Sequence, residues 1–469
     1  MWVRRIFFIM AMAGLAALGV WSLYFRQPTP DARMACYYGA YDLSDGRFVV
    51  ITPSGGVQNL RFVLMDGTTG KLRPTKASSQ DIPQKFSAGP GWEGEAPIRA
   101  TVTFSKCSDE KLDMTVDDSA PVTGTKRTFD ITEKTFDSHG LKLAGRLVMP
   151  RLEGAIPVAV LVHGSERDSA LVFNRLQYLL PASGIGVFVY DKRGTGASQG
   201  TYTQNFELLS DDAAAALTTA RTLAGSLASE VGFQGGSQAG WIEPLAATKV
   251  KADFIVVGYG LAESPLAEDR DEVVEDLRRK GYDDKVIAKA REVTTATGRV
   301  IASHFTIGFE ELDRVREKYS GEPWYQHAKG EFTGDILSYP NWLTKLLGPM
   351  FDVGTSWDYN PLPALNAYKG PHVWILAGRD GSAPSENTFA ILRGIQKTNP
   401  QLDIVMFPTA DHGITEFVEE GGVRTDTRFS EGYFQLMVDW ILFKSATSNA
   451  HGPIIYEGKQ LALESIPQQ

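Results

Sequence analysis

The chain has 469 residues, of which 43% are hydrophobic and 22% charged, and its formal net charge is −9. This length exceeds one ordinary core and predicts two or three domains, while the near-average composition argues against large-scale disorder. The acidic charge balance argues against a nucleic acid or an anionic lipid surface as a partner held by bulk electrostatics.

The first 25 residues form an apolar segment that begins with two arginines. Arg4 and Arg5 precede residues 6–25, which include no charged residue. A run of this length can cross a bilayer as a helix, and the positive-inside rule keeps the arginines in the cytoplasm. We therefore expect an N-terminal signal anchor and an extracytoplasmic body, in the periplasm or cell envelope. A cleaved signal peptide, which would leave a secreted protein, is the alternative.

A small all-β domain is expected over residues 35–128, after a polar linker at residues 26–34. Short alternating runs are separated by turn residues here, as in "GRFVVITPSGG", "APIRATVTFSKC" and "KLDMTV". The domain holds no cluster of catalytic residue types, so we expect a structural role or a role in substrate binding. Both cysteines, Cys36 and Cys107, lie in this region. They could pair in an oxidising compartment or remain free thiols, because spacing gives no distance between them.

From residue 129 to residue 469 the pattern is that of an α/β domain. Continuous apolar runs such as "VAVLVHG", "GIGVFVYD", "ADFIVVGYG" and "HVWILAG" are typical of buried parallel strands. Helical stretches separate them, which predicts a doubly wound, mostly parallel sheet. Charged helical patterns replace this alternation at about residues 262–359. We interpret that segment as a helical cap inserted over the carboxyl end of the sheet.

The stretch "VGFQGGSQAG" contains a candidate nucleophile, Ser237. It follows a buried-type strand and precedes a helix, and Gly235 and Ala239 stand two residues before and two after it. Small residues at these positions permit the sharp strand–turn–helix that exposes a nucleophilic serine. The usual pattern is G-x-S-x-G, and here alanine replaces the last glycine.

A serine nucleophile needs a base, and the base needs an orienting acid. Of the seven histidines, His412 in "FPTADHGITE" is best placed, since it follows a late predicted strand. Asp380 in "HVWILAGRDGSAP" ends the strand before it. The chain order Ser237, Asp380, His412 is that of α/β-hydrolases. The rival acids are Asp411, Glu386 and Asp352.

The oxyanion of an acyl-transfer intermediate requires backbone donors. The amide of Gln238 directly follows the nucleophile at the start of a helix. Ser165, in "VLVHGSERD" after an early strand, is the second expected donor, and His163 is expected to be structural. In "YDKRGTGAS", Asp191, Lys192 and Arg193 are expected to stabilise a loop through charge pairs.

Taken together, "VLVHGS", "VYDKRGTGAS", "GFQGGSQAG", "ILAGRD" and "ADHG" resemble the α/β-hydrolase superfamily in order and spacing. They are similar to bacterial serine esterases and related peptidase-like hydrolases over residues 129–445, with the insertion unmatched. The resemblance implies cleavage of a small-molecule carboxylic ester through an acyl-enzyme, without metal or organic cofactor. A serine peptidase or amidase with the same triad is one alternative. An inactive, hydrolase-like binding protein of the cell envelope is another.

Overall fold

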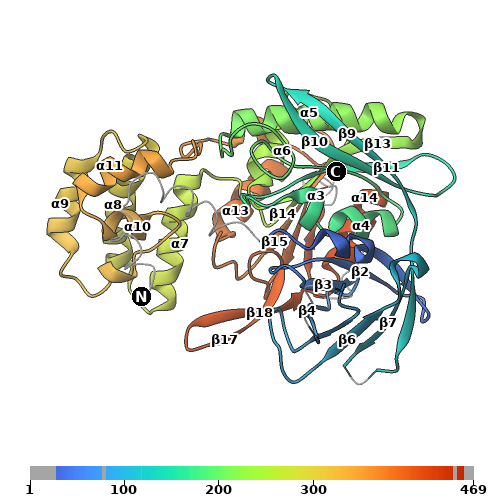
Figure 1. Cartoon of the computed structure of the whole chain (residues 1–469). Helices are drawn as coiled ribbons and strands as arrows, with labels where there is room; N and C mark the ends of the chain where they lie inside the picture. The colour runs from blue at the N-terminus through green and yellow to red at the C-terminus, as the bar shows by residue number, and fades with distance from the viewer. Residues whose placement is uncertain (1–27, 77–80, 118, 447–451, 459–469) are drawn as a thin grey trace, which may run out of the picture.

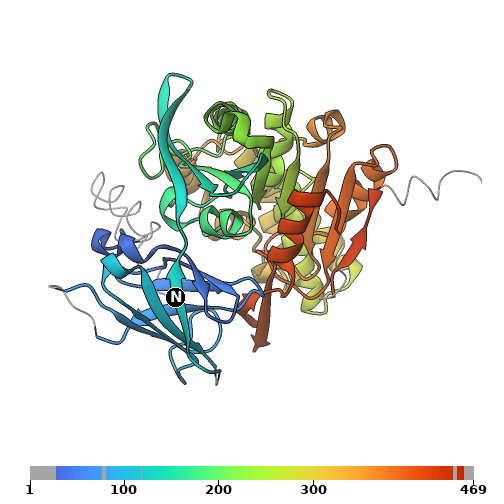
Figure 2. The same ribbon diagram turned by 90° about the vertical axis from the view of Figure 1, so that its right-hand side faces the viewer.

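An eight-stranded barrel and a nine-stranded mixed sheet form the frame of the protein (Figures 1 and 2). The computed structural model describes residues 28–76, 81–117, 119–446 and 452–458. The expected signal anchor at residues 1–25 lies outside these ranges. Among the described residues, no helix has both the length and the apolarity needed to cross a membrane.

The N-terminal domain is a closed antiparallel barrel, which confirms the expected small all-β unit. Its closure comes from the pairing of the first strand with the last, with Tyr41 opposite Lys126. Tyr37 stacks on Phe104 inside the barrel, with ring centroids 4.1 Å apart. The strands are β1 (Gly39–Leu43), β2 (Phe48–Pro53), β3 (Leu60–Leu64), β4 (Thr69–Pro74), β5 (Lys85–Ala88), β6 (Ala100–Phe104), β7 (Lys111–Val116) and β8 (Val122–Lys126). The short helices η1 (Ala32–Tyr37) and η2 (Cys107–Asp109) flank them.

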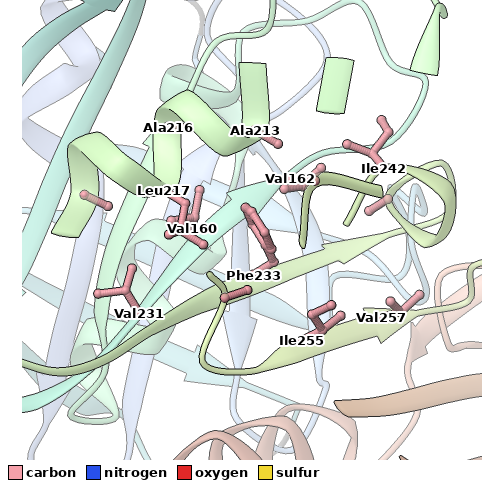
Figure 3. Packing of buried hydrophobic residues seen from close by; sticks show 14 of the residues in the cluster. Val160, Val162, Ala213, Ala216, Leu217, Val231, Phe233, Ile242, Ile255 and Val257 are labelled. Atoms are coloured by element: carbon pink, nitrogen blue, oxygen red, sulfur yellow. The ribbon is translucent and has the colours of Figure 1, made fainter. Parts of the chain in front are cut away.

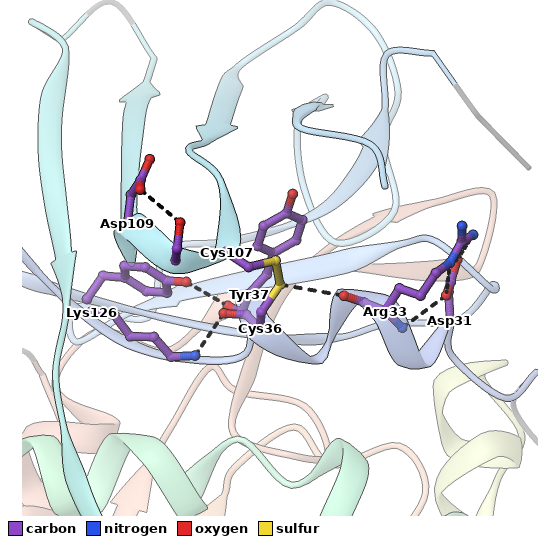
Figure 4. The surroundings of a disulfide bond; sticks show 9 residues. Asp31, Arg33, Cys36, Tyr37, Cys107, Asp109 and Lys126 are labelled. Atoms are coloured by element: carbon purple, nitrogen blue, oxygen red, sulfur yellow. Dashed lines mark hydrogen bonds and ion pairs between the residues drawn. A yellow bond between two sulfur atoms is a disulfide. The ribbon is translucent and has the colours of Figure 1, made fainter. Parts of the chain in front are cut away.

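A disulfide joins the two short helices of the barrel (Figure 4). Cys36 at the end of η1 is bonded to Cys107 at the start of η2, and their Cα atoms are 5.6 Å apart. Lys126 adds a second tie, because its ammonium donates to the carbonyl of Cys36 at 2.8 Å. Of the two possibilities that the sequence leaves open, the structure has the paired cysteines.

The second domain is built on a doubly wound, mostly parallel sheet, as predicted. The strand order is β19-β16-β15-β14-β13-β11-β12-β10-β9. The strands from β12 to β16 in this order are parallel to one another, whereas β10, β9 and β19 pair antiparallel with their neighbours. Their bounds are β9 (Phe129–Ser138), β10 (Leu141–Pro150), β11 (Ile156–Val162), β12 (Gly186–Tyr190), β13 (Ala228–Gly236), β14 (Ile255–Gly258), β15 (His372–Ala377), β16 (Leu402–Phe407) and β19 (Ile454–Tyr456).

Helices cover both faces of this sheet because alternate strand residues point to opposite sides. Val160 and Phe233 pack against Ala213 and Leu217 of α5 on one face (Figure 3). Leu161 belongs to the core on the other face. The first core includes α5 (Phe206–Ala224), α6 (Ala239–Ala247), α12 (Leu362–Ala367) and α13 (Glu386–Gln396). The second includes α3 (Ala170–Phe173), α4 (Leu176–Ala182) and α14 (Tyr433–Phe443), and the barrel strands β1, β2 and β3 contribute to it.

A helical cap leaves the sheet after β14 and returns before β15 (left in Figure 1). Ser264 begins its first helix by accepting a hydrogen bond from the amide of Ala267, and Pro265 stands at the first helical position, where its missing N–H costs nothing. The cap has a hydrophobic core of its own, which includes Val293, Leu312 and Trp324. Its helices are α7 (Pro265–Arg279), α8 (Asp284–Ala302), α9 (Phe309–Tyr319), η4 (Tyr325–His327), α10 (Thr333–Ser338) and α11 (Asn341–Phe351).

A hairpin connects the α/β domain to the barrel. Its strands are β17 (Thr415–Glu420) and β18 (Val423–Phe429), and β18 lies beside β4 of the barrel in Figure 1. The amide of Phe429 donates to Gly67 at 3.0 Å, and the amide of Trp92 donates to Asp426 at 3.1 Å. This hairpin is absent from the sequence prediction and joins the two domains through backbone hydrogen bonds.

Candidate active site

Ser237 lies on a sharp turn between β13 and α6. Its φ of 55° is in the left-handed region, which serine rarely adopts. The turn is held by backbone bonds, from the amide of Ser237 to Gly258 and from the amide of Gly240 to Ser237, both 2.9 Å long. A Cβ atom on Gly235 would lie 2.1 Å from the Val162 oxygen and 2.5 Å from Cβ of Ala239. The glycine is therefore a steric requirement of the turn, as predicted from the motif.

His412 and Asp380 form a hydrogen-bonded pair. Nδ1 of His412 lies 2.9 Å from Oδ2 of Asp380, and Asp380 is buried. The other carboxylate oxygen accepts from the amides of Ala383 at 2.7 Å and Ser382 at 3.1 Å, which orients the carboxylate. Because Asp380 engages Nδ1, the opposite ring nitrogen, Nε2, is left for the chemistry.

The pair sets the protonation behaviour of His412. Burial works against the charged imidazolium, but the charge of Asp380 and its hydrogen bond outweigh burial and raise the pKa of His412 above the usual 6.5. In a triad, the role of the acid is to stabilise the imidazolium that develops on the base.

The rival acids are engaged elsewhere. Asp411 accepts from the amides of Gly381 and His412 and pairs with Arg424 at 2.8 Å, so it holds the loop and not the imidazole ring. Asp352 pairs with His304 in the cap region, and Glu386 begins helix α13. The geometry therefore favours Asp380 over these rivals.

Ser237 and His412 line one cavity of about 540 Å³. Within the described residues, no hydrogen bond joins their side chains; in free enzymes the bond between nucleophile and base is often long and tightens on substrate binding. Tyr259 lines the same cavity: its ring meets the His412 ring edge-on at 4.9 Å, and it would collide with a Cβ atom on Gly236, the residue before Ser237. Sequence reasoning missed Tyr259, although an aromatic residue directly after a buried parallel strand was the available signal.

The two expected oxyanion donors flank the nucleophile. Gln238 is the N-cap of α6, so its amide is at the positive end of that helix. Ser165 follows β11, and the preceding Gly164 is close to Ser237: a Cβ atom there would lie 3.5 Å from Cβ of Ser237. The structure thus brings both predicted donors to the side of Ser237.

The carbonyls around Ser165 are fixed by two side chains. The Lys192 ammonium donates to the Gly164 oxygen, and the Tyr202 hydroxyl donates to the Ser165 oxygen, each at 2.5 Å. In a trans peptide the N–H points away from the preceding carbonyl. Because Lys192 holds the Gly164 carbonyl, the N–H of Ser165 points to the side of this peptide that faces away from Lys192.

This finding refines the expected role of the Asp191–Arg193 stretch. Arg193 does form a charge pair, with two hydrogen bonds of 2.7 Å to Asp212. Lys192, in contrast, bonds a backbone carbonyl. Asp191 accepts from the Ser169 hydroxyl at 2.8 Å and from the Ala197 amide at 2.9 Å.

Burial determines the charge of the groups behind the oxyanion loop. It lowers the pKa of Lys192 to about 8, with Glu166 acting in the opposite direction. Burial also lowers the pKa of His163 to about 3, so this ring is neutral, and Nε2 accepts from the amide of Lys192 at 3.3 Å. His163 therefore has the position of a structural residue behind the loop. Over the described ranges, no three His, Cys, Asp or Glu side chains gather as a metal site would require.

No protein-family model matches the chain, and no curated protein matches its sequence. Solved structures do match. An esterase from Pyrococcus furiosus is 15% identical, with 61% of this chain and 83% of that chain covered and a TM-score of 0.40. The acylaminoacyl peptidase of Pyrococcus horikoshii is 14% identical, with 88% of this chain and 58% of that chain covered and a TM-score of 0.42. A thermophilic esterase from Thermogutta terrifontis is 20% identical, with 60% of this chain and 91% of that chain covered and a TM-score of 0.33.

These similarities are too distant to bear on substrate or reaction. The sheet itself carries the resemblance expected from the motifs: its strand order, its antiparallel second strand and the strained turn at Ser237 are those of an α/β-hydrolase. The resemblance is confirmed for the fold.

Proposed function

We propose that the protein is a serine hydrolase that cleaves carboxylic esters through an acyl-enzyme. The observation that carries the proposal is the hydrogen bond of the buried Asp380 to His412, which lines the same cavity as Ser237 on its strained turn, at a φ of 55°. The candidate nucleophile, base and acid come from three separate loops. Folding alone does not require these three residue types to lie near one cavity, so their arrangement supports a catalytic role.

The reaction follows from these positions. Oγ of Ser237 attacks the ester carbonyl while Nε2 of His412 takes the hydroxyl proton, and Asp380 stabilises the imidazolium. The amides of Gln238 and Ser165 donate to the oxyanion. The intermediate collapses, the alkoxide leaves with the proton from His412, and the acyl group stays on Ser237. Water, deprotonated by His412, then attacks the acyl-enzyme and releases the acid and the free serine.

Two other functions remain as outcomes of the test. A peptidase or amidase would use the same triad, because the triad chemistry does not separate an ester from an amide. An inactive binding protein is disfavoured because all three members of the triad are present and Asp380 and His412 are hydrogen-bonded.

A fluorophosphonate probe separates an enzyme from a binding protein. We expect one label on the intact chain, located by peptide mapping at Ser237 and absent from Ser237→Ala. An unlabelled wild-type protein that is folded by circular dichroism would contradict the proposal. A panel of p-nitrophenyl esters and aminoacyl-anilides then compares kcat/KM for ester and amide bonds. Faster turnover of the anilides would replace the esterase by the peptidase.

We propose further that the body of the protein is extracytoplasmic and held at the membrane by residues 1–25. The Cys36–Cys107 bond supports this location, because disulfides persist mainly in oxidising compartments. A C-terminal reporter that is active only outside the cytoplasm should function in a fusion with the full chain. Activity of only the cytoplasmic reporter would refute the location.

A further inference from the structure

The cavity beside Ser237 contains an arginine that the mechanism above does not use. Arg175 stands just before α4 and lines the same cavity as Ser237 and His412. Its guanidinium lies over the ring of Phe429, 4.7 Å from the ring centroid. The side chain is surrounded by protein on most sides, while part of it remains open to the cavity.

Among the described residues, Arg175 differs from the enclosed Arg193 and Arg61 in forming no ion pair with an acidic side chain. Arg193 forms a two-pronged pair with Asp212, and Arg61 pairs with Glu93 at 2.9 Å. The ion pairs and hydrogen bonds of the described residues leave the guanidinium of Arg175 without a carboxylate. An enclosed charge is costly unless it is paired, and here burial lowers the pKa of Arg175.

Other charged groups in the cavity do not fill this role. Glu166 and Asp426 also line it; the charge of Glu166 acts on Arg175 and opposes the effect of burial on its pKa, but Glu166 lies against His163 at 3.6 Å and neither carboxylate forms an ion pair with Arg175. Asp426 accepts from the Thr415 hydroxyl at 2.9 Å, and burial raises its pKa. Behind the cavity wall, Arg61 lies over the ring of Trp92 at 4.4 Å, and its charge is met by Glu93, so Arg61 does not need an anion in the cavity.

We infer that Arg175 binds a carboxylate of the substrate, so that the preferred ester carries an anionic group on its acyl or alcohol part. A guanidinium presents a planar fork of donors that matches a carboxylate in two parallel hydrogen bonds. A cavity of about 540 Å³ holds a small ester together with such a group. This inference names the substrate class of the site and therefore rests on the proposed serine-hydrolase function.

Matched pairs of esters test the inference. Monomethyl adipate is compared with methyl hexanoate, and 4-acetoxybenzoate with 4-acetoxybenzamide, by proton release at constant pH. We expect wild type to prefer the anionic member of at least one pair. Arg175→Gln should lower kcat/KM for that member about ten- to hundredfold and leave the neutral member within about twofold, because a hydrogen bond to a charged group is lost.

The control removes an arginine charge far from the cavity. Arg299 is exposed on the cap and pairs with Glu311, so Arg299→Gln should leave the preference unchanged. A wild-type preference for the neutral esters, or an equal loss for both members in Arg175→Gln, would overturn the inference.

A binding measurement separates failure of this inference from failure of the proposed function. Adipate is titrated calorimetrically into Ser237→Ala and into the Ser237→Ala, Arg175→Gln double variant, with hexanamide as the neutral probe. Adipate should bind only when Arg175 is present. If wild type hydrolyses no ester but adipate binds in this pattern, the carboxylate site stands and the hydrolase function falls. Absence of adipate binding to Ser237→Ala overturns the site.

Discussion

The Lys192 ammonium is bonded to the carbonyl of Gly164, one residue before the expected oxyanion donor Ser165. The peptide between Gly164 and Ser165 is thereby held by a side chain from the loop after the neighbouring strand β12. A donor that is fixed before substrate arrives does not have to be reorganised during the reaction, which is the physical basis of oxyanion stabilisation.

Lys192→Met should consequently lower kcat by up to about a thousandfold, the upper end of the range for complete loss of one oxyanion donor, with a smaller change in KM. The pKa of Lys192 is about 8, so the ammonium loses its proton as the pH rises through that value. Wild-type kcat should fall at alkaline pH with a midpoint near this value, and this fall should be absent from Lys192→Met. Rate–pH profiles between pH 6 and 9.5 provide the measurement. A variant with wild-type kcat and an unchanged alkaline limb would show that the contact is only structural.

The triad should behave as one unit. Ser237→Ala, Asp380→Asn and His412→Ala should each reduce kcat by several orders of magnitude, and the losses should not add in double variants. Folding should survive, since all three side chains lie at turns or loops. Near-wild-type activity of Ser237→Ala would remove the serine mechanism, whereas an active Asp380→Asn alone would reassign the acid.

The acid limb of the rate profile should depend on Asp380. His412 acts as a base only when neutral, and the Asp380 carboxylate raises its pKa above 6.5. Wild-type kcat/KM should therefore rise with pH to a plateau reached only above this value. In Asp380→Asn the residual activity should reach its plateau at lower pH. An ascending limb at the same pH in both proteins would contradict the assignment.

Glu243 of α6 should destabilise the native state at neutral pH. Its side chain is fully buried beneath the nucleophile turn, and both carboxyl oxygens are without a hydrogen-bond partner among the described residues. Burial raises its pKa well above 4.5, so the folded state keeps a proton that the unfolded state loses. This part of the stability is complete below about pH 4.5 and declines as the pH rises above it.

The corresponding substitution is Glu243→Gln, which keeps the shape and removes the ionisation. At pH 8 the variant should be more stable than wild type, by about 1–3 kcal/mol, and the difference should shrink at pH 5. Urea unfolding at both pH values gives the free energies. Equal stability differences at the two pH values would refute the ionisation argument.

The disulfide should stabilise the barrel. It closes a separation of 71 residues, and its loss through Cys36→Ser with Cys107→Ser should cost about 2–4 kcal/mol. Mass spectrometry of the unreduced protein should show a mass lower by two hydrogens than that of the reduced protein. Two thiols that react with an alkylating reagent in protein from an oxidising compartment would contradict the bond.

The sheet and the nucleophile turn could be predicted because their signals are local. Continuous apolar runs mark β11 to β16, and the small residues around Ser237 follow directly from its backbone geometry. Closure of the barrel could not be predicted, since it depends on the pairing of Tyr41 with Lys126, and such long-range partners leave no local pattern. Both strands of the β17–β18 hairpin carry charged residues and lack a continuous apolar run.

The roles of Lys192 and Arg175 were hidden for a different reason. The role of Lys192 depends on its contact with a backbone carbonyl. The role of Arg175 depends on its lying over the Phe429 ring without an ion pair to a carboxylate of the described residues. Sequence identifies the charge but not its partner. Lys192 was consequently expected to form a charge pair, and Arg175 drew no expectation at all.

The hairpin that follows His412 has a consequence for any attempt to use the catalytic part by itself. Thr415, three residues after the candidate base, begins β17, and the returning strand β18 bonds to the barrel at Gly67 and Trp92. Removal of the barrel by truncation after residue 128 would leave the backbone groups of β18 that bond to Gly67 and Trp92 without partners. It would also uncover Phe429, which forms a wall of the cavity with Trp92. The barrel is thus an integral part of the unit that holds the candidate site, and an engineer who grafts this α/β domain onto another protein has to transfer both modules or rebuild the lost surface.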